Sequence, residues 1–166
     1  MSELFPLVDE TGAVTGKATR AECHSGTFWL HPVVHLHVVN PAGLLYLQKR
    51  SRSKDIQPGK WDTSVGGHVD FGETIEEALR REAFEELHIA GFAPVFAARY
   101  VWRSAVEKEL VNTFVTCYDG EIECDANEIE EGRFWCLPEI EESIGKNIFT
   151  PNFEHDFQLV KRYLTS

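Results

Sequence analysis

GHVDFGETIEEALRREAFEELHI, residues 67–89, is a glycine-led loop that runs into an amphipathic helix. At about 3.6 residues per turn, Glu82 and Glu86 lie one turn apart on the side of the helix that also carries Leu79, with Glu85 beside them. Apolar residues on that side predict packing against the protein interior. The helix therefore directs three carboxylates toward the stripe that normally joins the core.

These three carboxylates need a compensating charge. Like charges at i,i+4 repel each other, and burying an unpaired carboxylate costs far more than leaving it in water. A bound divalent cation removes both costs, and hard oxygen ligands suit Mg²⁺ or Mn²⁺. Because Mg²⁺ commonly binds substrate phosphates as well as carboxylates, the pattern predicts a phosphorylated substrate. The alternative is a solvated acidic face that is paired with neighbouring arginines.

Local signals specify the start of the helix. Thr74 and Glu77 form a capping box, in which each side chain can accept a hydrogen bond from the backbone N–H of the other residue. On the exposed side, Glu76 with Arg80 and Glu77 with Arg81 have the i,i+4 spacing of stabilising ion pairs. We therefore expect a helix here, independent of the role of Glu82, Glu85 and Glu86.

The same residues resemble the Nudix box, a motif with many fixed positions. Its pattern of Gly, five residues, Glu, seven residues, Arg-Glu, an apolar residue, any residue and Glu-Glu falls on Gly67, Glu73, Arg81, Glu82, Ala83, Glu85 and Glu86. The glycine that normally follows, and that caps the helix C-terminus, is replaced by His88. This departure puts the cap geometry in question and leaves the acidic residues intact.

The Nudix resemblance implies an α/β fold, an α/β/α sandwich with a mixed sheet, and hydrolysis of a nucleoside diphosphate linked to another group. It implies a site for Mg²⁺ or Mn²⁺ formed by Gly67, Glu82, Glu85 and Glu86. Glu73 and Arg81 would hold the box together and complete the catalytic set. The cation would neutralise the diphosphate and activate a water, with a glutamate that the sequence does not identify as general base.

Outside the box, the chain resembles type I isopentenyl diphosphate isomerase, a Nudix-fold enzyme that does not hydrolyse its substrate. The resemblance covers nearly the whole chain and rests on VDETGAVTGKATRAECHSG, LHPVVHLHVVN, LQKRSRSKDIQPGKWDTSVGGH and VEKE. It implies a second divalent-metal site formed by His24, His31, His68, Glu107 and Glu109. It also implies that the diphosphate is bound by Arg20, Arg50 and Lys54. The alternative is that these three residues are ordinary solvated surface charges.

Two substitutions argue against isomerase chemistry. The isomerase needs a cysteine in the loop before its metal-binding histidine to move a proton at carbon, and Gly66 stands at that position. It also places a tryptophan near its C-terminus to stabilise a carbocation, and Asn152 stands there in this chain. The complete acidic box therefore favours a metal-dependent hydrolase that cleaves a diphosphate linkage. Isomerisation of isopentenyl diphosphate and noncatalytic binding of a metabolite remain the alternatives.

Periodicity predicts strands and helices on both sides of the box. We expect strands at 4–8, 13–18, 32–39, 44–49, 62–65, 95–102 and 110–118, and helices at 138–144 and 153–164. In the third of these strands, alternation puts Val34, Leu36 and Val38 on one face and His35 and His37 on the other. We interpret these two histidines as structural.

Length and composition predict a single domain over residues 1–166, with an N-terminal hairpin at 1–30 packed onto it. The chain has 166 residues, of which 43% are hydrophobic, and this is enough to bury a sizeable core.

The formal charge of −11 disfavours nonspecific binding to nucleic acid or to an anionic membrane. We expect a small-molecule diphosphate as the partner. The acidic tract at 121–142 is either a solvated face or a subunit contact of a homodimer.

Cysteine spacing and the N-terminus bear on the cellular compartment. The chain has four cysteines, Cys23, Cys117, Cys124 and Cys136. No two of them have the CxxC spacing that is typical of metal or redox sites. The sequence has no secretory signal and no apolar run long enough to span a bilayer. We therefore expect reduced thiols and a cytoplasmic protein.

Overall fold

Residues 3–52 and 57–164 are described by the computed structural model, and their strands form a mixed seven-stranded sheet and a two-stranded hairpin. The sheet order is β5-β4-β3-β8-β7, with β6 paired to β3 and β9 paired to β4. The strand bounds are β3 Leu30–Val39, β4 Leu45–Arg50, β5 Trp61–Asp62, β6 Val65–His68, β7 Val95–Arg103, β8 Lys108–Cys117 and β9 Ile129–Trp135. Strand β3 is parallel to β8 and antiparallel to β4 and β6, so the sheet is mixed.

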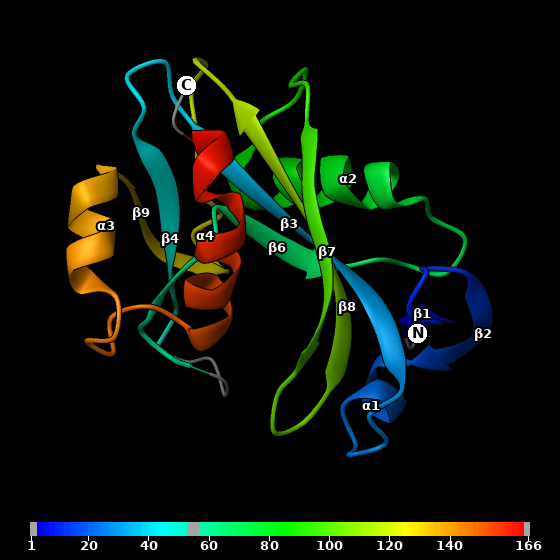
Figure 1. The fold of residues 1–166 in the computed structure, drawn as a ribbon. Coiled ribbons are helices and arrows are strands. Elements are labelled where there is room, and N and C mark those ends of the chain that lie inside the picture. Colours follow the sequence, from blue (N-terminus) through cyan, green and yellow to red (C-terminus); the bar gives the residue numbers. More distant parts are fainter. Residues whose placement is uncertain (1–2, 53–56, 165–166) are drawn as a thin grey trace.

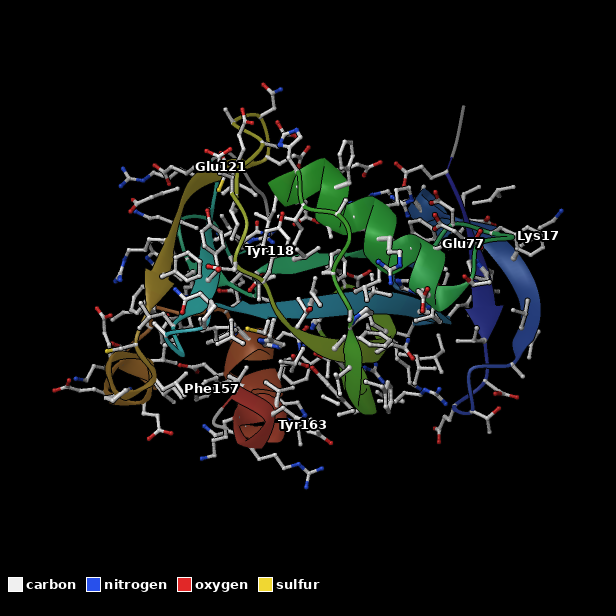
Figure 2. All side chains as sticks on the ribbon, turned by 90° about the horizontal axis from the view of Figure 1, so that it is seen from above. Lys17, Glu77, Tyr118, Glu121, Phe157 and Tyr163 are labelled. Carbon is white, nitrogen blue, oxygen red and sulfur yellow. The ribbon has the colours of Figure 1, made fainter. Side chains whose placement is uncertain are left out.

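Helices cover both faces of this sheet. Helix α2 (Ile75–Leu87) lies on one face and α4 (Pro151–Leu164) on the other (Figure 1, Figure 2). The short helix α3 (Leu137–Ser143) follows β9, and α1 (Arg20–Cys23) follows the hairpin. Within the described ranges, no helix has the length and apolar character that crossing a membrane requires. The predicted α/β/α sandwich with a mixed sheet is confirmed.

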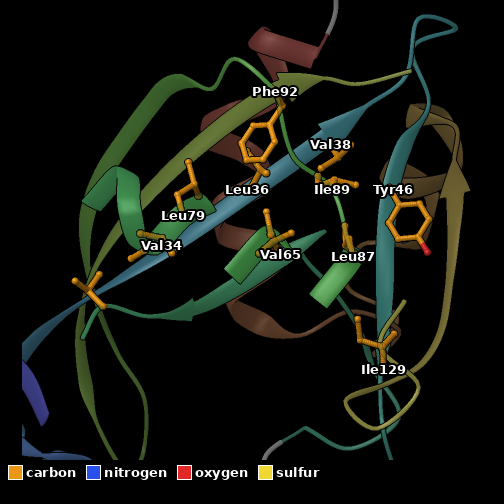
Figure 3. Close-up of a cluster of buried hydrophobic side chains, with 13 residues drawn as sticks. Val34, Leu36, Val38, Tyr46, Val65, Leu79, Leu87, Ile89, Phe92 and Ile129 are labelled. Atoms are coloured by element: carbon orange, nitrogen blue, oxygen red, sulfur yellow. The ribbon is translucent and has the colours of Figure 1, made fainter. Parts of the chain in front are cut away.

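Strand β3 runs through the middle of the molecule and separates two apolar clusters. The first cluster packs between the sheet and α2 (Figure 3) and includes Val34, Leu36, Val38 and Leu79. The second packs between the sheet and α4 and includes Val39, Phe149, Phe153 and Phe157. His35 and His37 face Asp156 of α4, so the predicted alternation along β3 is confirmed.

The N-terminal hairpin packs beside one end of the sheet (Figure 1). Its strands are β1 (Leu4–Val8) and β2 (Val14–Thr19), which are antiparallel. The buried ring of Phe5 stacks on the rings of His31 and His68, with centroid distances of 5.7 and 4.6 Å. The hairpin therefore forms one wall around histidines that the sequence singles out.

The prediction of one strand at 62–65 is wrong, because the chain changes partners within this segment. Strand β5 pairs with β4, whereas β6 pairs with β3. Between them, the buried Ser64 hydroxyl accepts a hydrogen bond from the Val38 N–H and donates one to the Tyr46 carbonyl. A side chain thus satisfies backbone groups where the strand pairing is interrupted.

Two elements are absent from the prediction. Strand β9 lies inside the acidic tract at 121–142, pairs with β4, and buries Ile129 and Trp135. Its charged exposed positions conceal the alternation, so the tract contains a strand that the sequence did not predict. Helix α1 has four residues, and its one clear signal is a capping box formed by Thr19 and Glu22.

Candidate active site

The Arg81 guanidinium is the centre of the charged network on α2. Its Nε and Nη2 atoms donate to the two carboxylate oxygens of Glu73 at 2.7 and 2.9 Å. Nη1 donates to Glu82 at 2.7 Å and to Glu85 at 3.3 Å, and Nη2 also donates to the His68 carbonyl at 3.0 Å. The pairing lowers the pKa of Glu73 and raises that of Arg81. Arg81 therefore joins the helix to the preceding loop and to β6.

Glu82 and Glu86 form a partly buried carboxylate pair on the acidic side of α2. Burial raises the pKa of both groups, and the neighbouring Glu82 carboxyl raises that of Glu86 further, well above its usual value. Gln48 Nε2 donates to Glu86 Oε1 at 2.6 Å, and the Gly66 N–H lies 3.5 Å from the same oxygen. Without a cation the raised pKa values favour a proton on this pair, and a divalent cation suits the same position.

Gly67 allows the backbone of β6 to approach Glu82 closely. A β-carbon on residue 67 would lie 2.2 Å from Cδ and 2.3 Å from Oε2 of Glu82. The carboxylate cannot simply turn away, because Arg81 holds its other oxygen. Glycine at position 67 is therefore required for steric reasons.

His88 takes over the role of the glycine that is missing at the C-terminus of α2. Its backbone is left-handed with a φ of 56°, and its N–H donates to the Phe84 carbonyl at 3.0 Å. Its ring Nδ1 lies 2.8 Å from the Glu123 carbonyl, which holds the residue in this conformation. The helix cap is therefore preserved without glycine.

The two ion pairs expected on the exposed side of α2 have different outcomes. The pair of Arg80 with Glu76 is confirmed, with an Nε to Oε2 distance of 3.3 Å. The prediction that Arg81 pairs with Glu77 is wrong. Glu77 instead accepts a hydrogen bond from the Thr74 N–H in the predicted capping box, and Arg81 turns toward the acidic side of the helix.

A second group of candidate ligands lies beside the hairpin. This group consists of His24, His31, His68 and Glu107. Each of these residues offers one ligand atom, and the four atoms all lie within 4.8 Å of one another. Glu107 Oε2 lies 2.5, 3.1 and 3.8 Å from the Nε2 atoms of these three histidines, in that order. Glu109 Oε2 is 3.8 Å from His68 Nε2. All five residues expected in the second metal site are therefore brought together.

The electrostatics of this second group suit a divalent cation. Burial lowers the pKa of His24 and His68, which favours neutral imidazoles. Their Nε2 atoms are buried and lack a well-aligned hydrogen bond within the described part of the chain. Burial and the Glu107 charge raise the pKa of Glu109 to about 8. Neutral imidazoles combined with carboxylates are ligands for Mn²⁺ or Zn²⁺ as well as Mg²⁺.

The basic residues expected to bind diphosphate come from different elements. Arg50, at the end of β4, is partly buried and has Nη1 3.4 Å from Asp62 Oδ2. Arg20, at the start of α1, is exposed and has Nη1 3.7 Å from Glu3 Oε2. Lys54 lies outside the described residues.

Sequence reasoning missed a buried polar group on the α4 side of the sheet. The Asp156 carboxylate accepts hydrogen bonds from Thr113 at 2.8 Å and from Tyr100 at 2.5 Å. Its oxygens also lie 2.5 Å from His37 Nε2 and 3.5 Å from His35 Nδ1. A signal existed, because Asp156 has the helical spacing of the buried apolar residues of α4. An acid at such a position needs partners.

Comparisons with known proteins agree with the fold. The family model described as NUDIX domain matches residues 29–154. An uncharacterized Nudix hydrolase from Nostoc is 44% identical over 87 residues, and the match covers 52% of each chain, so this chain spans about half of that relative. An isopentenyl-diphosphate Delta-isomerase from Kocuria rhizophila is 32% identical over 142 residues, or 82% of this chain and 78% of the relative. The crystal structure of DR0079 from Deinococcus radiodurans has a TM-score of 0.80 at 27% identity and covers 96% of this chain and 98% of that one.

Substitution of Gly67 by alanine tests the close approach of β6 to α2. The new β-carbon would overlap the Glu82 carboxylate, so we expect a loss of about 1–3 kcal/mol in the free energy of unfolding. Thermal unfolding should show a decrease in Tm of about 3–8 °C, and calorimetric titration should show weaker binding of Mg²⁺. Gly16→Ala is a matched control, because its β-carbon would make an ordinary contact of 3.8 Å with Leu7. Equal stability of the two variants would contradict the steric argument.

Glu109 provides a prediction about pH. Its pKa is raised to about 8 in the folded chain, whereas an unfolded glutamate titrates near about 4.3. Between these values the folded state binds more protons than the unfolded state, so stability decreases as pH rises. Glu109→Gln cannot ionise and removes this loss. In metal-free buffer we expect the variant to gain about 3–4 kcal/mol relative to wild type between about pH 5 and about pH 8. Urea denaturation at both pH values measures the gain, and a pH-independent difference would argue against a buried, protonated Glu109.

Proposed function

The chain belongs to the Nudix family, and from this premise we propose that it is a metal-dependent pyrophosphohydrolase that cleaves the diphosphate linkage of a nucleoside-diphosphate-type substrate. One observation carries the proposal, namely the Glu82 and Glu86 carboxylate pair that is anchored by Arg81 and packed against Gly67. Such a pair needs a proton or a cation. A cation bound there would also attract the phosphate oxygens of a substrate.

Each residue of the box has a role in this proposal. We assign the Mg²⁺ or Mn²⁺ ligands to the backbone at Gly67 and to the carboxylates of Glu82, Glu85 and Glu86. The cation supplies charge neutralisation at the diphosphate and a lower pKa for a bound water. Arg81 keeps Glu82 oriented, and Glu73 keeps Arg81 in place through its bidentate pairing. One glutamate of this group accepts the proton of the attacking water.

The remaining assignments concern the substrate and a second cation. We assign diphosphate binding to Arg20, Arg50 and Lys54. Partial burial of Arg50 next to Asp62 supports its part in this assignment, because a partly desolvated guanidinium interacts strongly with phosphate. We assign a second divalent cation to His24, His31, His68, Glu107 and Glu109. The free thiols of all four cysteines are in keeping with a cytoplasmic enzyme.

Conversion of single box glutamates to glutamine tests the proposed hydrolysis. Glu86→Gln and Glu82→Gln keep the side-chain shape and remove the charge that would hold the cation. We expect each to lower kcat/KM by about 100-fold or more, because a metal ion supplies several kcal/mol of transition-state stabilisation. The assay follows phosphate species released from a panel of nucleoside diphosphate derivatives in Mg²⁺ and in Mn²⁺. Glu76→Gln, on the exposed side of the same helix, serves as control. Full turnover by Glu86→Gln would refute the proposal.

Isomerisation of isopentenyl diphosphate is the second candidate, and the assembled histidine and glutamate group favours it. Gly66 and Asn152 count against it, because neither can supply a thiol or an aromatic face. We therefore expect no exchange of solvent deuterium into isopentenyl diphosphate, as measured by NMR with Mg²⁺ and Mn²⁺ present. Exchange at a rate that depends on Glu109 would instead establish the isomerase.

A further inference from the structure

His35 differs from the other groups around Asp156 because part of its ring is not buried. Its Nδ1 lies 3.5 Å from Asp156 Oδ1, and its side chain keeps 11% of its surface exposed. His37 binds the other oxygen of the same carboxylate and has no exposed side-chain surface. The two histidines share one carboxylate, but His35 also reaches accessible space.

The edge of the His35 ring that carries Cδ2 and Nε2 faces β6 at Gly66. A β-carbon on residue 66 would lie 3.5 Å from Cδ2 and 3.9 Å from Nε2 of His35, and Gly66 itself is exposed. Within residues 3–52 and 57–164, Nε2 of His35 has no hydrogen-bond partner. The N–H of Gly66 lies 3.5 Å from Glu86 Oε1. The Cδ2–Nε2 edge of the ring therefore lies against β6, on the face of the sheet opposite to α2, while the backbone N–H of the same glycine points to the carboxylate pair of α2.

Charges around His35 favour its protonated form. Burial alone would lower the pKa of His35, but the nearby carboxylates, Asp156 above all, outweigh burial and raise it. The titratable groups that act on this ring or on its carboxylate partner are Asp156 from α4, Asp62 from β5, Glu109 from β8, Tyr100 from β7 and His37 from β3. A protonated ring would place its Nδ1–H 3.5 Å from Asp156 Oδ1, within ion-pair distance, and would direct an Nε2–H donor toward Gly66.

A structural clamp between α4 and the sheet accounts for only part of this arrangement. Asp156 with His37, Thr113 and Tyr100 would already hold the helix, since these groups satisfy both carboxylate oxygens. A clamp needs neither a histidine with an accessible ring edge nor a glycine opposite that edge. The two features together mark a place where a ligand can approach an imidazole N–H donor beside Asp156.

We propose that His35 contacts the substrate, with its Nε2–H donating a hydrogen bond to an anionic oxygen of the diphosphate group in the space beside Gly66. Asp156 is the positioning residue that keeps the ring oriented. This inference rests on the proposed pyrophosphohydrolase function, because it assigns the contact to the same diphosphate that the α2 carboxylates bind through a cation. It adds to that function a donor from the face of the sheet opposite to α2.

Binding of a non-hydrolysable diphosphate tests this contact. The probe is methylenediphosphonate in the presence of Mg²⁺, titrated calorimetrically into the full chain. We expect His35→Gln to weaken binding by about 10- to 100-fold, as is typical for loss of a hydrogen bond to a charged group. His155→Gln, which changes an exposed histidine of α4, is the control, and it should bind within about threefold of wild type. Thermal unfolding verifies that each variant is folded.

A measurement on the unmodified chain keeps the test independent of mutation. In ¹⁵N NMR of the histidine rings, the Nε2 signal of His35 should shift when methylenediphosphonate and Mg²⁺ are added. Asp156→Asn should lower the pKa of His35 in the same spectra and weaken probe binding most at pH values between the wild-type and variant pKa, where only the wild-type ring is protonated. The probe-induced shift of the His35 signal and the loss of probe binding would not occur if Asp156 only held α4 in place, whereas the pKa of His35 would fall in either case.

The outcomes separate this inference from the function on which it rests. If Glu86→Gln abolishes probe binding while His35→Gln binds as wild type and the His35 signal stays fixed, the contact is refuted and the proposed function stands. If the wild type does not bind the probe with Mg²⁺ and Glu86→Gln retains full hydrolytic turnover, the proposed function itself fails.

Discussion

The close contact between α2 and β6 at Gly67 is the constraint on which the rest of the site depends. One guanidinium, that of Arg81, joins the helix, the loop before it and the strand through hydrogen bonds to Glu73, Glu82 and the His68 carbonyl. Charge-assisted bonds in a partly buried setting are stronger than exposed ion pairs. They hold the Glu82 carboxylate where a side chain at position 67 would otherwise stand. A pair of like charges can persist on a core-facing stripe because this frame prevents it from turning into solvent.

Strand β6 brings different groups to its two faces, because successive residues of a strand point in opposite directions. Gly67 faces the carboxylates of α2, whereas Gly66 and His68 face the side that carries His35 and the histidine and glutamate group. The short strand therefore borders every candidate ligand group in the chain that the structure describes. A diphosphate lying along β6 could interact with a cation on the α2 side and with a donor on the other side. The absence of a side chain at 67 admits the Glu82 carboxylate, and the absence of one at 66 leaves room beside the Cδ2–Nε2 edge of His35.

The sequence predicts those features whose cause is local, and it misses those that depend on tertiary partners. The capping box of Thr74, the spacing of the box acids and the alternation of β3 all depend on residues close in the chain. The partner of Arg81 could not be chosen from i,i+4 spacing, because Glu73 reaches it from the preceding loop. Likewise, Asp156 acquires its role from side chains on three strands distant in sequence, and β9 becomes a strand by pairing with β4. Tertiary pairing overrides local propensity in both cases.

The polar network beneath α4 also bears on the choice between the two Nudix chemistries. Asn152 donates a hydrogen bond to the Tyr100 hydroxyl at 2.9 Å, and Tyr100 in turn donates to Asp156. The position that a tryptophan occupies in the isomerase is therefore part of a hydrogen-bonded chain that ends on a buried carboxylate. Stabilising a carbocation requires an electron-rich aromatic face, and a hydrocarbon substrate would leave nearby polar groups without partners. Imidazole and amide groups instead suit a polar partner better than a hydrocarbon. The two substitutions at 66 and 152 and the buried Asp156 network thus act in the same direction, away from carbon chemistry and toward the phosphate linkage.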